Sequence, residues 1–163
     1  MAKSLKTVEP DFLRSAPFRL VTEAHIAHPI AAVFAAIAEQ PENWHRWFPG
    51  FAKGGRYLTP APYGAGARRE MKVAGLTVTE TVLVWEAPKR WVFFIERAAM
   101  PGIRALAEDW ALSPVDDGHT TLTWTFAVDL APAMKVGGPL LGAPAKALIR
   151  RAAKNLDRYL AKG

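Results

Sequence analysis

The sequence predicts an α+β domain in which a curved antiparallel sheet wraps around a long C-terminal helix. Three observations lead to this fold class. Residues 143–160 have the spacing of an amphipathic helix, residues 51–130 contain six successive strand-like stretches, and one strand with two short helices precedes them. A sheet that is apolar on one face and a helix with one apolar stripe can bury both surfaces if the sheet curls around the helix.

The chain opens with residues 1–16, which mix charges with Pro10 and show no clear period, so we interpret them as an N-terminal extension, flexible in part. A single domain is expected over residues 17–163, because 163 residues ordinarily form one domain. Residues 18–26 alternate between apolar and polar side chains and predict the first strand, which ends at His28-Pro29.

Two short helices are predicted next. Pro29 opens the first, in which Ile30, Val33, Phe34 and Ile37 recur at helical spacing. Pro41 ends that helix and begins a second one, which Pro49-Gly50 stops.

The following stretches predict an antiparallel meander, because turn-forming residues such as Gly75, Pro88-Lys89 and Asp116-Asp117-Gly118 separate them. With the first strand they give a sheet of about seven strands. The clearest is the last, in which Leu122, Trp124 and Phe126 share one face. The expected strands cover residues 51–59, 67–75, 76–87, 90–98, 103–115 and 119–130.

The end of the chain is predicted to be a loop or broken helix over residues 131–142, followed by the long helix. In this helix Ala145, Ile149 and Ala152 lie on the apolar stripe, while the cations lie outside it. Alanines on a stripe that faces the core leave space, and this space is where we expect a ligand.

The chain resembles the Bet v 1-like, or START-like, superfamily (SRPBCC), and within it the polyketide cyclase/dehydrase and lipid transport group. The resemblance covers about residues 18–161. It implies a helix-grip fold with a cavity between the sheet and the long helix that holds an apolar or amphipathic small molecule. The matching features are HPIAAVFAAIAEQPENWHRWFPG, VTETVLVWEAPKRWVFF, EDWALSPVDDGHTTLTWTF and the basic terminal helix.

Two carboxylates are the candidate catalytic groups. If Trp110 points inward, strand alternation also points Glu108 inward, and Val78 and Val82 do the same for Glu80. A carboxylate in an apolar pocket often has a raised pKa and serves in binding or proton transfer. The alternative is that each acid lies in water at the cavity mouth, or is paired with an arginine at position 68, 69 or 104.

Aromatic side chains are the second group of candidates, because large flat side chains suit a ring-containing ligand. Trp44 and Trp47 either cap the pocket entrance or form a core plug beneath the first helix. The residues expected to contact the ligand are Trp47, Glu80, Val82, Phe93, Glu108, Trp110, Trp124, Phe126, Ala145, Ile149 and Ala152.

The charge distribution and the residue types present limit the classes of partner that we expect. Of the net charge of +6, most comes from residues 143–163, which hold six cations and one acid, so the excess is local to one helix face. We interpret that face as solvated; the alternatives are an anionic membrane surface, nucleic acid or an acidic partner. With no cysteine and no HExxH spacing, neither metal nor cofactor is expected. We expect a cytoplasmic protein without nucleic acid or integral membrane association, and the sequence assigns no oligomeric state.

Two functions remain open. The first is a carrier or sequestering protein for a lipid-like or polyketide-like molecule. The second is an enzyme, a cyclase, dehydratase or hydrolase-like catalyst that uses Glu80 or Glu108 as acid or base. A regulatory protein that uses the basic helix on nucleic acid or membrane ranks third. The resemblance covers carriers and enzymes alike, so it does not choose between the first two.

Overall fold

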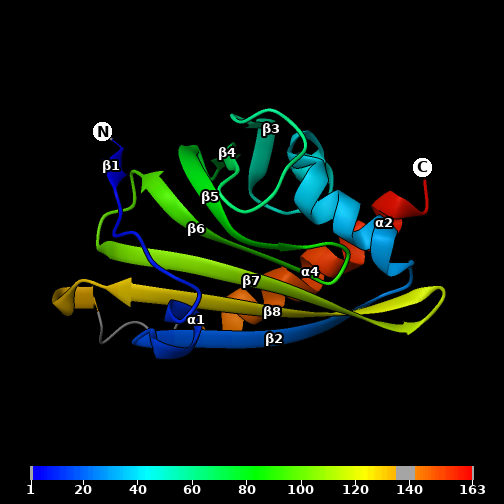
Figure 1. Ribbon diagram of the computed structural model, residues 1–163. Coiled ribbons are helices and arrows are strands. Elements are labelled where there is room, and N and C mark those ends of the chain that lie inside the picture. The colour runs from blue at the N-terminus through cyan, green and yellow to red at the C-terminus, as the bar shows by residue number, and fades with distance from the viewer. Residues whose placement is uncertain (1, 135–141, 163) are drawn as a thin grey trace.

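The computed structural model describes residues 2–134 and 142–162, and it confirms the α+β fold class (Figure 1). An antiparallel sheet of eight strands is followed by one long helix. The strands are β1 (Lys3–Ser4), β2 (Phe18–Ile26), β3 (Phe51–Tyr57), β4 (Arg68–Val73), β5 (Leu76–Glu86), β6 (Arg90–Ala98), β7 (Ile103–Asp116) and β8 (His119–Leu130). The helices are α1 (Phe12–Ser15), α2 (Ile30–Phe34), the π-helical turn η1 (Ala35–Glu39), the 3-10 turn η2 (Pro41–Asn43), α3 (Trp44–Trp47) and α4 (Gly142–Leu160).

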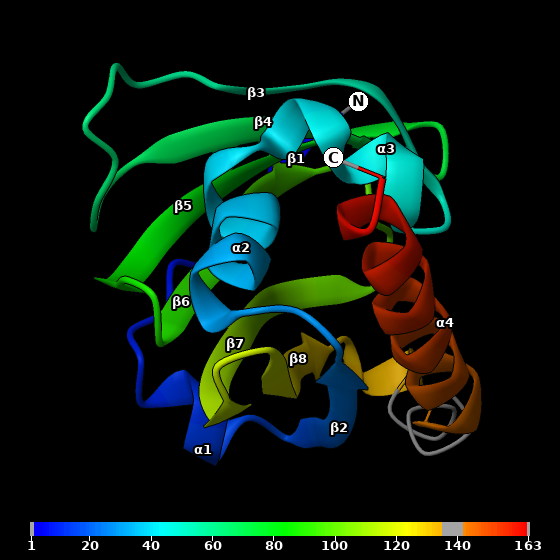
Figure 2. The same ribbon diagram turned by 90° about the vertical axis from the view of Figure 1, so that its right-hand side faces the viewer.

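The sheet has the order β2-β8-β7-β6-β5-β4-β3, and β1 adds a short pairing to β6. From β3 to β8 each strand pairs with the next one along the chain, as a meander requires. Register shifts between Val82 and Val84 and between Ile103 and Ala105 mark irregularities of the kind that bend strands. Figure 2 shows the result: the sheet curves, and α2, α3 and α4 lie on its concave side.

Alternation along the strands decides which residues enter the core. In β2, Leu20, Thr22, Ala24 and Ile26 are buried while the residues between them are exposed. The turn from β4 to β5 uses Ala74 and Gly75, both with positive φ (49° and 78°), which is the backbone that a two-residue hairpin favours. The predicted strands and their faces therefore correspond closely to the observed sheet.

Helix α4 closes the concave side of the sheet. Its buried residues are Ile149, Ala152, Ala153 and Leu156. Three polar contacts join it to neighbouring segments: the backbone N–H of Ala27 donates to Asp157 Oδ1 at 2.7 Å, His28 Nε2 lies 3.0 Å from the carbonyl oxygen of Asp157, and Asn155 Nδ2 donates to the carbonyl of Trp47 at 3.0 Å. The helix is thus held at β2 and at the end of α3.

A glycine allows the helical corner to sit directly on β3. A Cβ built on Gly55 would lie 2.2 Å from the carbonyl oxygen of Pro41, so any other residue would push η2 away from the strand. This close approach positions the aromatic residues of α3 over the concave face.

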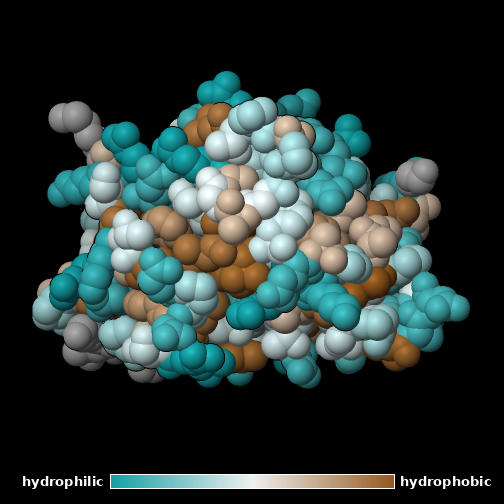
Figure 3. All heavy atoms as spheres, in the orientation of Figure 1, coloured by the Kyte–Doolittle hydropathy of each residue, from teal (hydrophilic) through white to brown (hydrophobic). Residues whose placement is uncertain are grey.

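The first residues of the chain pack on the convex face of the sheet. Lys3 and Ser4 pair with β6, and Val8 and Leu13 are buried. Together with Val92, Phe94, Ala105, Ala107 and Ala127 they form a second apolar cluster, separate from the main core. Figure 3 shows apolar side chains gathered in the middle of this face, over β6 and β7, surrounded by hydrophilic ones. The strands are therefore apolar on both faces here, and the N-terminal segment covers part of the convex one.

No helix among the described residues is both long and apolar enough to cross a bilayer. The loop or broken helix expected over residues 131–142 falls mainly on residues 135–141, which lie outside the described residues.

Candidate functional site: a cavity between the sheet and α4

A cavity of about 460 Å³ lies between the concave face of the sheet and the first turns of α4. Six aromatic side chains come from the helical corner and the strands, and the rest of the lining is almost entirely aliphatic. The described residues that line it are Trp44, Phe48, Phe51, Val73, Val78, Glu80, Phe93, Ile95, Met100, Ile103, Leu106, Glu108, Trp124, Phe126, Pro144, Ala145, Leu148 and Ile149. Glu80 and Glu108 are the two acids of this lining.

Glu108 occupies the middle of the sheet. Its neighbours across the strands are Phe93 on β6 and Phe126 on β8, so apolar rings flank the carboxyl group on both sides. Its Oε2 accepts two indole hydrogen bonds, from Trp124 Nε1 at 2.8 Å and from Trp110 Nε1 at 3.0 Å. One carboxyl oxygen is therefore fixed by two donors from β7 and β8.

The other oxygen of Glu108, Oε1, has no hydrogen-bond partner in the part of the chain that the structure describes. The pKa of Glu108 is raised to about 7, mainly by burial and also by the nearby Glu80, while the indole N–H of Trp124 acts in the opposite direction. The residue forms no ion pair with any described cation. Near neutral pH, Glu108 can thus hold or release a proton at an oxygen that a ligand in the cavity can reach.

Glu80 is the second acid, and it differs from Glu108 by having a cationic partner. It lies directly across the β4–β5 pair from Arg69, and Arg69 Nε donates to Glu80 Oε2. Glu80 is 2% exposed and Arg69 is 0% exposed. Burial raises the pKa of Glu80, while the positive charge of Arg69 opposes this effect. Of the alternatives set out for Glu80, the structure thus shows an arginine pair, in which Glu80 lines the cavity and Arg69 does not.

Aromatic rings surround the guanidinium of Arg69. Its central carbon lies 4.1 Å from the ring centre of Trp91, 4.5 Å from that of Trp44 and 5.2 Å from that of Phe93. Nη1 donates to the carbonyl of Ile37 at 3.3 Å. Cation–π contacts and the Glu80 carboxylate offset the cost of burying this charge.

The chain matches a known protein family over most of its length. Residues 17–161 match the family described as polyketide cyclase / dehydrase and lipid transport. The chain belongs to this family. An uncharacterized protein of Mycobacterium tuberculosis is 31% identical over 153 residues, which cover 91% of this chain and 87% of the relative. A protein of Mycobacterium bovis, also uncharacterized, matches with the same values.

Solved structures agree with this family in fold. A START superfamily protein from Mycobacterium smegmatis superposes with a TM-score of 0.70 at 16% identity, over 89% of this chain and 98% of that one. The di-domain ARO/CYC BexL from the BE-7585A biosynthetic pathway gives a TM-score of 0.69 at 16% identity, over 86% of this chain and 45% of that one. Both likenesses show that this polyketide cyclase/lipid transport family member shares the fold of these proteins.

The structure brings seven of the expected ligand-contacting residues together around the cavity of this family member: Glu80, Phe93, Glu108, Trp124, Phe126, Ala145 and Ile149. Four other expected residues do not line it: Trp47, Val82, Trp110 and Ala152. All four are buried in the main core instead.

The two tryptophans among these four have other roles. Trp47 packs against Trp44, with ring centres 4.8 Å apart, and its carbonyl holds Asn155 of α4, so the core-plug alternative describes it. Trp110 does not line the cavity but donates to Glu108, so it positions the carboxyl group. Trp44, for which the same core plug was the alternative, does line the cavity.

Several lining residues were not predicted as ligand contacts. Val78 and Leu106 have the same parity as Glu80 and Glu108, so alternation could have identified them. No local pattern identifies Phe48 and Phe51, because the approach of the α3–β3 corner to the sheet brings them there. The other unpredicted lining residues are Trp44, Val73, Ile95, Met100, Ile103, Pro144 and Leu148. Among the described residues, no three His, Asp or Glu side chains gather into a group that could hold a metal ion.

Proposed function

We propose that this protein binds one apolar or amphipathic small molecule in the cavity between the sheet and α4, and that it acts as a carrier or sequestering protein. The observation that supports this most directly is the lining: aromatic and aliphatic side chains surround two carboxyl groups, and only Glu108 lacks a cationic partner among the described residues. Apolar pockets with a few placed polar groups are the usual form of small-molecule sites.

The lining also suggests the shape of the ligand. A volume of about 460 Å³ suits a molecule of a few fused rings or a short lipid. The rings of Phe93, Trp124 and Phe126 favour a flat, ring-containing body. A hydroxyl or carbonyl group of the ligand would lie at Glu108, which is half-buried and so more accessible than the almost fully buried Glu80.

The protonation of Glu108 decides what it offers the ligand. When it is protonated, Oε1 donates to a carbonyl or hydroxyl oxygen while Oε2 keeps both indole hydrogen bonds. When it is ionised, Oε1 accepts from a ligand hydroxyl. A pKa of about 7 makes both forms available near neutral pH.

Native mass spectrometry of the freshly purified protein tests the proposal, and the expected result is a co-purified organic molecule bound one to one. As a defined probe, 2-naphthol combines a flat ring system with one hydroxyl group. We expect saturable quenching of tryptophan fluorescence, and a weakening of about tenfold in Glu108→Gln, because one hydrogen bond to a charged group contributes about 1.5–3 kcal/mol. The matched control is Glu86→Gln, an exposed acid at the end of β5. Equal affinity in both variants would contradict the role of Glu108.

An enzyme of the cyclase, dehydratase or hydrolase-like type is the second candidate, and the raised pKa of Glu108 favours it. A group that titrates near the working pH is suited to general acid–base catalysis. One structural neighbour is itself named an ARO/CYC protein. Turnover separates the two functions: a carrier returns its ligand unchanged, whereas an enzyme produces a new compound at a rate that titrates near pH 7 and is lost in Glu108→Gln.

A further inference from the structure

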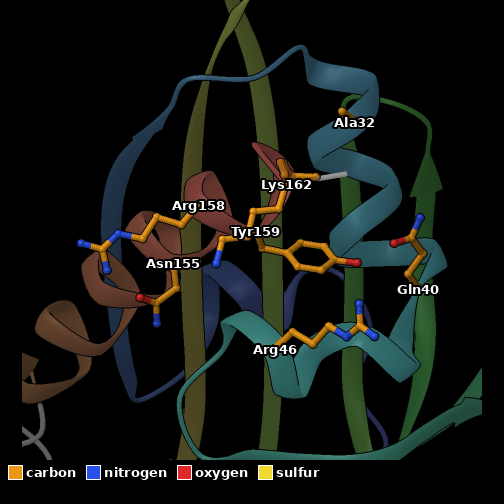
Figure 4. A pocket seen from close by; sticks show the side chains of 8 residues that line it. Ala32, Gln40, Arg46, Asn155, Arg158, Tyr159 and Lys162 are labelled. Atoms are coloured by element: carbon orange, nitrogen blue, oxygen red, sulfur yellow. The ribbon is translucent and has the colours of Figure 1, made fainter.

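A second cleft, of about 820 Å³, lies at the other end of α4, where the C-terminal turns of this helix approach α2, η1 and α3 (Figure 4). It shares no lining residue with the apolar cavity. Its chemistry is also different, because most of its side chains are polar. The described residues that line it are Ala32, Gln40, Arg46, Asn155, Arg158, Tyr159, Leu160 and Lys162.

Positive charge is the first property of this cleft. Arg46 comes from α3, and Arg158 and Lys162 come from the end of α4, so segments more than a hundred residues apart bring cations to one place. None of the three takes part in an ion pair within the described part of the chain, whereas Arg68 and Arg90 are paired with acids. No described lining residue is an acid. The cleft therefore attracts anions.

Neutral hydrogen-bond donors are its second property. Tyr159 is half-buried, and in Figure 4 its ring extends from α4 so that the hydroxyl points towards the side chains of Gln40 and Arg46, while Arg158 points away from them. The hydroxyl of Tyr159 has no hydrogen-bond partner among the residues described. A hydroxyl group, an amide and a guanidinium that converge without a carboxylate form a set of donors for the oxygens of one anion.

The size of the cleft indicates which anions suit it. The cleft exceeds the volume that a single inorganic ion fills, so an anionic group with an organic body uses it better. Phosphate matches the donors well, since its several oxygens accept from guanidinium, ammonium and hydroxyl groups together. The basic side of α4 would then provide one end of a defined ligand site.

We propose that this cleft binds an organic phosphate, either a free phosphate ester or the headgroup of an anionic lipid. Arg46 and Tyr159 contact the phosphate from opposite walls, and Arg158 and Lys162 add positive charge at the rim. This site is independent of the apolar cavity, so a protein could hold both ligands at once.

Isothermal titration calorimetry with phenyl phosphate tests the proposal on the full chain. We expect saturable binding of one phosphate per chain, weakened at least tenfold in Arg46→Gln and several-fold in Tyr159→Phe. The matched control is Arg151→Gln, which removes the same charge from an exposed position of α4 that does not line the cleft. If Arg151→Gln weakens binding as much as Arg46→Gln, the attraction belongs to the helix face as a whole and the proposal is wrong.

A sedimentation arm distinguishes the two sources of phosphate. Vesicles of phosphatidylcholine with one fifth phosphatidic acid are compared with vesicles of phosphatidylcholine alone. Binding of phenyl phosphate supports a free ester, and loss of vesicle binding in Arg46→Gln but not in Arg151→Gln supports a lipid headgroup. Absence of binding in both arms at low salt overturns the proposal. Quenching by 2-naphthol should be unchanged in Arg46→Gln, so a failure of this site is separable from a failure of the apolar one.

Discussion

Trp124 donates its indole N–H to Oε2 of Glu108 at 2.8 Å, from the strand next to the one that carries the acid. Trp110 donates to the same oxygen at 3.0 Å. Two rigid rings therefore fix the orientation of a carboxyl group whose other oxygen has no hydrogen-bond partner among the described residues. Because hydrogen bonds from neutral donors favour the ionised form of an acid, the same contacts also control how Glu108 titrates.

Substitution Trp124→Phe is expected to raise the pKa of Glu108 above its value of about 7, since one donor to the carboxylate is lost while burial persists. The pKa can be measured by carbon-detected NMR of the side-chain carboxyl group as a function of pH. The control is Trp85→Phe, which changes a tryptophan that makes no hydrogen bond to Glu108. A carboxyl pKa that stays near 7 in Trp124→Phe would show that the indole contact does not govern the titration.

The stability of the protein should fall as the pH rises through the range in which Glu108 loses its proton. The folded-state pKa of about 7 lies above the ordinary value of 4.5, so between these values the folded state holds the proton more tightly than the unfolded state. The free energy of unfolding is then reduced by up to roughly 3 kcal/mol above pH 7 relative to pH 4.5, at 1.36 kcal/mol for each pKa unit. Glu108→Gln removes this component.

Urea denaturation of the wild type and of Glu108→Gln at several pH values measures this component as the difference between the two curves. Other titrating groups contribute equally to both proteins and cancel. The variant should gain stability relative to the wild type at pH 8 and none at pH 4.5. Parallel curves for the two proteins would rule out a shifted Glu108.

The buried ion pair between Glu80 and Arg69 is expected to support the fold. Glu80→Gln leaves the guanidinium buried without its counter-charge and should cost about 3–5 kcal/mol of unfolding free energy. The double variant Arg69→Met with Glu80→Leu should recover most of this loss, because apolar residues of similar volume often replace a buried pair without penalty. Glu96→Gln, at a more exposed pair with Arg68, should cost less than about 1 kcal/mol. A small effect of Glu80→Gln would mean that water reaches the pair.

Strand alternation predicted the fold and the direction of the two acids because it depends on local geometry alone. Glu80 and Glu108 lie on the faces that their neighbours indicated, and β2, β6 and β8 have the predicted bounds. The same alternation could not show how far along the sheet the cavity extends. Val82 and Trp110 therefore lie on the predicted face of their strands, but they do not line the cavity.

Contacts between distant segments account for the cavity and core residues that the sequence did not predict. Phe48 and Phe51 enter the cavity wall because Gly55 lets the helical corner approach β3, and no periodicity in the sequence encodes that approach. Leu13 lies in a segment without a period, so its burial depends on an apolar convex face that lies more than seventy residues further along the chain.

The N-terminal segment should contribute to stability without affecting the cavity. Leu13 is 4% exposed and packs in the cluster on the convex face. Leu13→Ala should cost about 2–4 kcal/mol, as buried leucines generally do. Leu58→Ala is the control, because this leucine is 43% exposed and its loss should change stability by less than about 0.5 kcal/mol. Affinity for 2-naphthol should be the same in both variants; equal stabilities would instead show that the Leu13 side chain does not stabilise the domain.

The small residues of α4 provide the last test, because they make the space in which a ligand is proposed to lie. Ala145 lines the cavity, whereas Ala152, one to two turns further along, is buried in the core beyond it. Ala145→Trp should fill part of the volume of about 460 Å³ and abolish binding of 2-naphthol, with the fold retained because the indole replaces empty space. Ala147→Trp adds the same side chain at an exposed position of the same helix and should bind normally. If both variants bind 2-naphthol like the wild type, the ligand site lies away from α4.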